Sequence, residues 1–168
     1  ARELDVPLVG IYDLISWYQA RDGVKGIGFN KGGTVDLGGA KVTMVNACHS
    51  SSVGGDSGPV YAGAEAGFMI AGEGHTIYVS GDTDIMADMG WMAEYYKPDI
   101  GILCAGGHYT MDMAQAAWVS RKFFNFRNII PCHYRTFGLL AQSADELRRG
   151  VDPHVAVHTP AVMEALTF

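Results

Sequence analysis

The sequence contains few cysteines, a deficit of basic residues and no long apolar run. Only three of its 168 residues are cysteines, and no two form a C-x-x-C pair, so neither a disulfide scaffold nor a structural zinc knuckle is expected. Lysine and arginine number 12 against 18 acidic residues. The net charge of −6 argues against a general nucleic-acid binder, which needs a basic face for phosphate contacts. Glycine, histidine or a charge interrupts every apolar run, so no membrane span is expected.

Several catalytic signatures are missing as well. The chain has no G-x-S-x-G elbow of a serine hydrolase, no G-x-x-x-x-G-K-[ST] phosphate loop and no G-x-G-x-x-G opening a helix. Residues 1–5 carry no apolar leader segment, and the odd number of cysteines is typical of a reducing compartment. We therefore expect a cytoplasmic protein whose chemistry depends on other residue types.

The composition that remains is that of one globular domain spanning residues 1–168. Hydrophobic residues make up 48% of the chain and charged residues 18%, which suffices for a single core. The first half predicts mainly strands, and the second half alternates strands with helices, a pattern typical of an α/β layered fold. Helices are expected at 12–21, 85–96, 111–124 and 143–149, strands at 5–11, 26–30, 34–37, 41–48, 66–71, 76–80, 99–104, 128–131 and 155–157, and a loop at 50–58.

Three short motifs follow apolar, β-branched runs directly. They are N-A-C-H-S-S-S around His49, S-G-D-T-D around Asp82 and I-P-C-H-Y around His133. Strand ends are where open α/β sheets hold their chemistry, so two imidazoles and a carboxylate are expected at one edge of the sheet. Histidine and aspartate are ordinary ligands of a divalent cation. The motifs therefore predict a metal-dependent hydrolase.

Each of these residues also has an ordinary structural interpretation. Asp82 can belong to a turn, with Asp84 capping the helix expected near residue 85, and a single strand-end histidine is often only hydrogen-bonded. His108 follows the strand at 99–104 and a Gly-Gly turn, where it is either a loop residue or a group that contacts substrate. His75 is expected to be exposed at a hairpin tip, and Asp99 to be an ordinary surface or cap carboxylate. Cys48 and Cys132 are expected to pack beneath the site, because neighbouring residues in a strand face opposite ways.

Taken in order over residues 32–137, these motifs resemble the metallo-β-lactamase superfamily. The nearest branch is that of metal-dependent hydrolases related to ascorbate-6-phosphate lactonase. The resemblance implies an αββα sandwich with a metal site at one rim. It also implies that His49 and His133 are metal ligands and that Asp82 bridges two ions. Four motifs in the family's order carry this resemblance: C-H-S-S, G-D-T, G-G-H-Y-T-M and P-C-H-Y-R-T-F.

The sequence departs from the family in one respect. The family's H-x-H-x-D-H signature is absent from this chain. No two of the six histidines are separated by a single residue. We therefore expect this chain to be the carboxyl-terminal part of a longer protein. The amino-terminal segment would come from a separate chain, clipped or split, and the assembly is expected to be a homo-oligomer. The alternative is a natural short protein whose initiator methionine was removed before Ala1.

The resemblance also implies a mechanism. Two divalent cations, zinc most readily and manganese or iron as alternatives, would ionise a water that attacks an ester, lactone or phosphodiester. Asp82 and His108 would be catalytic. Ser50, Thr83 and Tyr134 would orient ligands or contact the substrate. The competing interpretation is a metal-free scaffold or regulatory subunit that keeps the fold without catalysis.

Overall fold

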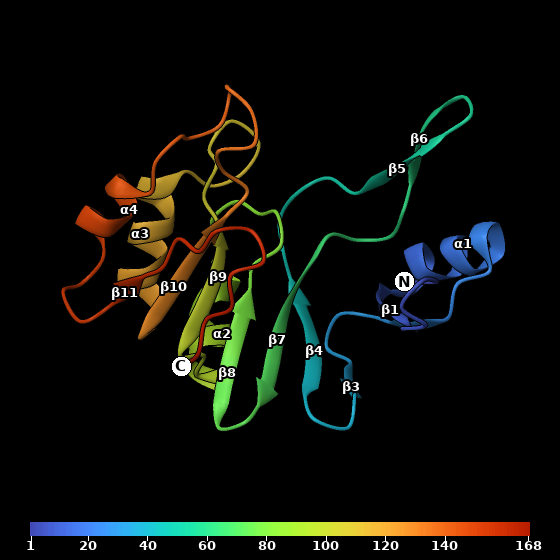
Figure 1. The fold of residues 1–168 in the computed structure, drawn as a ribbon, viewed down its shortest axis with the longest axis horizontal. Coiled ribbons are helices and arrows are strands. Elements are labelled where there is room, and N and C mark those ends of the chain that lie inside the picture. The colour runs from blue at the N-terminus through green and yellow to red at the C-terminus, as the bar shows by residue number, and fades with distance from the viewer.

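The structure, a computed structural model, describes residues 1–168 and contains eleven strands and four helices (Figure 1). The strands are β1 Leu8–Ile11, β2 Gly26–Phe29, β3 Thr34–Asp36, β4 Lys41–Asn46, β5 Ser52–Gly55, β6 Gly58–Tyr61, β7 Ala66–Gly72, β8 His75–Val79, β9 Ile100–Cys104, β10 Asn128–Cys132 and β11 Ala156–Val157. The helices are α1 Tyr12–Asp22, α2 Asp88–Tyr96, α3 Met113–Phe123 and α4 Asp145–Gly150. None of these helices has the length and apolar character that crossing a membrane requires.

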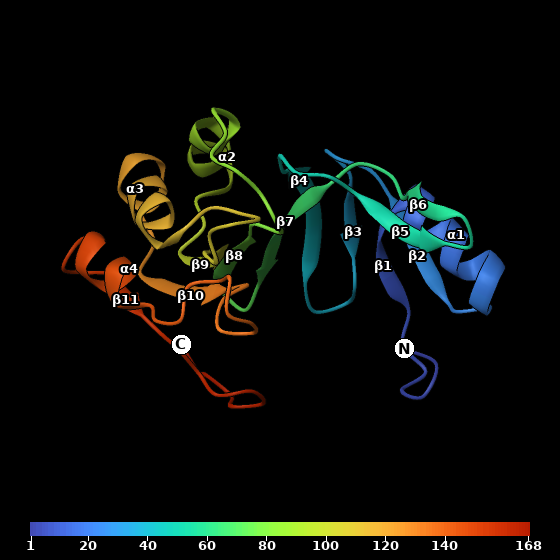
Figure 2. The same ribbon diagram turned by 90° about the horizontal axis from the view of Figure 1, so that it is seen from above.

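A seven-stranded sheet in the order β11-β10-β9-β8-β7-β4-β3 forms the centre of the molecule. Strands β8, β9, β10 and β11 are parallel, and β8, β7, β4 and β3 pair antiparallel in succession. Parallel neighbours need a crossover connection. The segments containing α2, α3 and α4 provide these three connections, and α2 and α3 lie on one face of the sheet (Figure 2). This arrangement confirms the expected α/β class.

The main core lies between the sheet and these helices. Tyr78, Leu103 and Ile129 point from the strands into a buried cluster that includes methionines of α2 and α3. Side chains alternate along a strand, so the neighbouring residues Ile77 and Ile102 lie on the opposite face. That second face is also apolar but only half-buried, and the carboxyl-terminal segment crosses part of it (Figure 2).

Strands β1 and β2 form a separate two-stranded parallel sheet joined by α1. Helix α1 ends at Gly23, whose positive φ of 64° lets its N–H bond the carbonyl of Gln19, as the glycine at this position predicts. Figure 1 places this unit at the end of the molecule farthest from α4.

Two sequence expectations are wrong at the level of elements. The segment 50–58, expected to be a loop, contains β5 and the start of β6, which pair as an antiparallel hairpin. Helix α2 begins at Asp88 rather than near residue 85, and Ala87 precedes it without a side-chain cap. Asp84 is therefore not a helix cap, and its carboxylate accepts a bond from the Ile85 N–H instead. The remaining boundaries differ from expectation by up to three residues.

Candidate active site at one edge of the sheet

The carboxyl ends of β4, β8, β9 and β10 lie at the same edge of the central sheet. Strands β8, β9 and β10 are parallel. Strand β4 runs in the same direction as β8, because both are antiparallel to β7. Each of these four strands is followed by a loop that carries one of the residues singled out by the sequence. We call this edge, where the arrowheads of β8 and β9 point in Figure 1, the rim. Its candidate residues, from the loops after the four strands, are His49, Asp82, His108 and His133.

Two buried hydroxyl groups join the loops of the rim. Thr83 is fully buried, and its Oγ1 accepts a bond from the Cys48 N–H at 2.9 Å and donates to the Asp84 carbonyl. The Ser80 Oγ accepts from the Cys104 N–H at 3.0 Å. These two bonds hold the segment around Asp82 against the ends of β4 and β9. Thr83 was expected to support the site, whereas Ser80 was missed, although a serine directly after an apolar strand offered a signal.

The structure brings Asp82 and His133 together. His133 Nε2 lies 3.6 Å from Asp82 Oδ2, with the side chains 27% and 46% exposed. His133 adopts a left-handed backbone conformation, with φ 56°, and its carbonyl lies against Gly106. A Cβ added to Gly106 would meet that carbonyl oxygen at 1.9 Å, so only glycine fits there without displacement. His133 Nδ1 is buried and has no hydrogen-bond partner.

His49 lies at the rim but makes other contacts. Its Nε2 is 3.1 Å from the Tyr109 carbonyl oxygen, and its Nδ1 is 2.9 Å from that of Ser50. Both ring nitrogens are therefore directed at backbone oxygens rather than at Asp82. The preceding residue, Cys48, is exposed, contrary to the expectation that it packs beneath the site. The reason is that β4 ends at Asn46, so the strand alternation does not reach Cys48.

Cys132 does pack against the core, as expected. Burial raises the pKa of its thiol to about 12, with smaller contributions from Cys104 and Asp82 nearby. The thiol is therefore protonated at neutral pH in this environment. Cys104 is its direct partner across β9 and β10, and both thiols are free.

The other predicted site residues differ in how they are placed. His108 is exposed and also has a left-handed backbone, with φ 48°. Ser50 is exposed, and its carbonyl faces His49. The ring of Tyr134 is partly buried against the main core. His108 and Ser50 are thus accessible from solvent, while Tyr134 serves packing.

The donors present fit a divalent cation in kind. An imidazole nitrogen and a carboxylate oxygen 3.6 Å apart are typical ligand types for zinc, manganese or iron. Only two such donors lie together here, because no group of three or more His, Cys, Asp or Glu side chains is clustered closely enough to hold one ion. Asp82 and His133 are therefore the two ligand candidates that this structure brings together.

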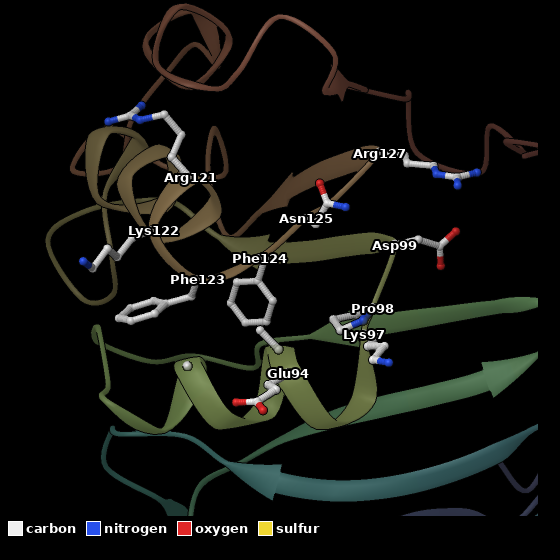
Figure 3. A pocket seen from close by; sticks show the side chains of 12 residues that line it. Glu94, Lys97, Pro98, Asp99, Arg121, Lys122, Phe123, Phe124, Asn125 and Arg127 are labelled. Carbon is white, nitrogen blue, oxygen red and sulfur yellow. The ribbon is translucent and has the colours of Figure 1, made fainter.

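A separate cavity of about 470 Å³ lies at the opposite edge of the sheet, between α2 and α3 (Figure 3). It contains none of the rim residues, and three of its four basic side chains, Lys97, Arg121 and Lys122, lie at the carboxyl ends of the two helices. The helix dipole stabilises basic side chains at the carboxyl end of a helix, so their presence in this cavity is explained without a bound ligand. Arg121 and Arg127 extend away from one another on opposite sides of this cavity (Figure 3).

His75 and Asp99, near the same edge, correct two expectations. His75 is half-buried rather than exposed, and its Nδ1 lies 2.6 Å from Asp99 Oδ2. Asp99 also accepts a bond from the Thr76 N–H at 2.9 Å. Partial burial alone would raise the pKa of Asp99, but the hydrogen bonds from His75 and Thr76 outweigh burial, and the pKa lies below its usual value.

Comparison with known proteins gives consistent matches. Residues 11–134 match the family described as the beta-lactamase superfamily domain. The chain is 69% identical over 166 residues to a UPF0173 metal-dependent hydrolase of Paracoccus denitrificans, a match covering 99% of this chain and 72% of that protein. A UPF0173 metal-dependent hydrolase of Cereibacter sphaeroides is 68% identical over 168 residues, covering 100% and 73%. Among solved structures, Igni18, a metallo hydrolase from Ignicoccus hospitalis, superposes with a TM-score of 0.84 at 30% identity, covering 99% of this chain and 70% of that one.

Proposed function

The chain belongs to the beta-lactamase superfamily, among relatives named metal-dependent hydrolases, and on that premise we propose that it hydrolyses an ester, lactone or phosphodiester at the rim. The observation that carries this proposal is the approach of His133 Nε2 to Asp82 Oδ2 at 3.6 Å, from loops that follow different strands. When bound there, a divalent cation lowers the pKa of a coordinated water and stabilises negative charge that develops on the substrate.

The ligand roles follow from the donors and their positions. We propose a site for two divalent cations, zinc by preference, which Asp82, His133 and His49 would hold. To bind a cation through Nε2, His49 would first have to break the contact between Nε2 and the Tyr109 carbonyl oxygen. Thr83 holds the Asp82 segment in place through its buried hydroxyl.

The other predicted residues, His108, Ser50 and Tyr134, would support this chemistry in different ways. His108 is exposed and precedes Tyr109, whose carbonyl lies 3.1 Å from His49 Nε2, so it can hydrogen-bond the substrate or transfer a proton to the leaving group. Ser50 is accessible next to His49 and can orient it. Tyr134 follows His133 in the chain and is partly buried against the main core, so it would help to position the loop that carries His133.

We propose that further ligands come from an amino-terminal H-x-H-x-D-H segment of the same protein, present as a separate chain. Zinc takes four ligands, and the Asp82–His133 pair supplies two donors. Two-stranded parallel sheets such as β1–β2 are rarely stable alone, so added strands would stabilise that unit. The proposal includes a relation to ascorbate-6-phosphate lactonase, assembly as a homo-oligomer in the cytoplasm and a small-molecule substrate, with neither nucleic acid nor membrane as partner.

The test uses the complete protein and three generic substrates: an ester, a lactone and a phosphodiester. We expect hydrolysis of at least one, loss of that activity with a chelator, and recovery when a divalent metal is added. The Asp82→Ala variant should lose roughly a hundredfold or more in kcat, because removing one group that stabilises transition-state charge costs that much. Asp56→Ala, at an exposed position in the β5–β6 hairpin, is the matched control and should behave as wild type. Full activity in Asp82→Ala would disprove the role of this carboxylate.

A further inference from the structure

Two exposed aromatic rings lie together on the loops that carry His108 and His133. Tyr109 is 52% exposed and Phe137 is 47% exposed. Their ring centroids are 6.1 Å apart, although they belong to loops that follow different strands. Single exposed apolar residues are ordinary on protein surfaces. Two that meet across separate loops form a continuous apolar surface, which we call the aromatic pair.

Both rings are held in place by contacts within the rim. The imidazole of His108 packs edge-on against the Tyr109 ring, with 4.4 Å between the two ring centroids. The Gln142 side chain donates a hydrogen bond to the Phe137 carbonyl at 3.0 Å, which fixes the loop that bears this ring. A surface that is already ordered loses little entropy when a ligand binds, so such contacts favour a binding role.

The aromatic pair also borders the residues proposed to carry out hydrolysis. The Tyr109 carbonyl lies 3.1 Å from His49 Nε2. On the other loop, the Ala141 N–H donates to the Gly106 carbonyl at 2.9 Å, and Gly106 packs against the backbone of His133. A substrate bound at the rim would therefore lie beside these rings.

We infer that the aromatic pair is a specificity surface that binds a planar apolar group of the substrate next to the bond that is cleaved. This inference rests on the proposed hydrolase function and adds the class of substrate. An aryl-bearing ester or lactone buries its ring against Tyr109 and Phe137 and gains stacking and edge contacts. A small or strongly hydrated substrate makes no such contact and binds more weakly.

The experiment compares substrates that differ by one phenyl group: methyl acetate with methyl phenylacetate, and γ-butyrolactone with γ-phenyl-γ-butyrolactone. Wild type should have the higher kcat/KM for the phenyl member. The double variant Tyr109→Ala/Phe137→Ala should lose roughly tenfold of that preference, measured as the ratio of kcat/KM for the phenyl member to kcat/KM for the small member. Phe137→Leu, which keeps apolar volume but removes a ring, should lose part of the preference even if the double variant is unstable. Tyr95→Ala, which removes a ring that is 76% exposed on α2, is the control and should change nothing.

A binding measurement separates failure of this inference from failure of the hydrolase proposal. Saturation-transfer NMR with phenylacetate, and with acetate as the comparison, reports contact with the aromatic pair without turnover. Phenylacetate should give a signal with wild type and lose it with the double variant. Hydrolysis without any difference between the substrates or variants would overturn the inference and leave the hydrolase intact. Phenylacetate binding without hydrolysis of any substrate would overturn the hydrolase and leave the binding surface.

Discussion

Gly106 is the residue whose size most directly limits the geometry of the rim. Its α-carbon faces the His133 carbonyl, and a Cβ would also lie 2.9 Å from His133 Nδ1. The position of His133 relative to Asp82 therefore depends on a neighbour with no side chain. The Gly-Gly pair before His108 marked a turn in the sequence, but not a contact with a distant histidine, because that contact exists only once β9 and β10 are paired.

We expect Gly106→Ala to destabilise the complete protein by about 1–3 kcal/mol, because the backbone of His133 must move to admit the methyl group. Urea denaturation measures the loss. Gly138→Ala is the matched control, since it lies in the loop after β10 with nothing within 4 Å of an added Cβ. Equal stability of the two variants would contradict the steric role of Gly106.

Thr83→Val tests whether the buried hydroxyl holds the Asp82 segment. Valine has nearly the same shape, so the change removes two hydrogen bonds and leaves the Cys48 N–H without its partner. Losing the two partly buried bonds should together cost about 1–3 kcal/mol, which thermal unfolding should detect. Thr83→Ser keeps the hydroxyl and should recover most of the loss. If serine and valine are equally destabilising, the hydrogen bonds are not the cause.

At the scale of elements, strand and hairpin positions follow from apolar alternation and turn residues, and the β7–β8 hairpin confirms this. Two elements depart from what the sequence predicts. The β5–β6 hairpin has a Ser/Gly-rich sequence with little apolar alternation, so the pairing has no clear signal. Helix α2 begins later than expected, and the Asp84 N–H before it bonds the Cys48 carbonyl, a long-range contact that ties this stretch to the loop after β4 and has no sequence signal.

Asp99 joins the starts of β8 and β9, and its removal should destabilise the sheet at that end. Asp99→Ala breaks the bonds to His75 and Thr76, at a cost of about 1–3 kcal/mol at neutral pH. The folded-state pKa of Asp99 lies below its usual 3.8, so its stabilising contribution is complete above that value. The contribution is lost as the pH falls through the lowered pKa. Urea unfolding of wild type and variant should therefore differ at pH 7, and the difference should shrink as the pH falls below the usual pKa of 3.8. Asp56→Ala is the control, and a difference that persists in acid would contradict this account.

At the scale of the whole molecule, the α/β fold and the class of metal-dependent hydrolase expected from the motifs are confirmed by the family match and the relatives. Strand-end motifs predicted that Asp82 and His133 would meet, because strand direction places them at one edge. The contacts of His49 and the half-buried His75 could not be predicted, since they depend on how loops fold back. The helices cover one face of the central sheet, and the other face is apolar and half-buried (Figure 2). This second face is consistent with the sandwich that the resemblance implies.

The metal content of the complete protein tests the central claim most directly. Inductively coupled plasma mass spectrometry should find stoichiometric divalent metal in wild type and in His154→Ala, which alters an exposed histidine away from the rim. His133→Ala and Asp82→Ala should each lose most of that metal while remaining folded by circular dichroism. Undiminished metal in both rim variants, or no stoichiometric metal in wild type, would contradict the claim that Asp82 and His133 hold the cation.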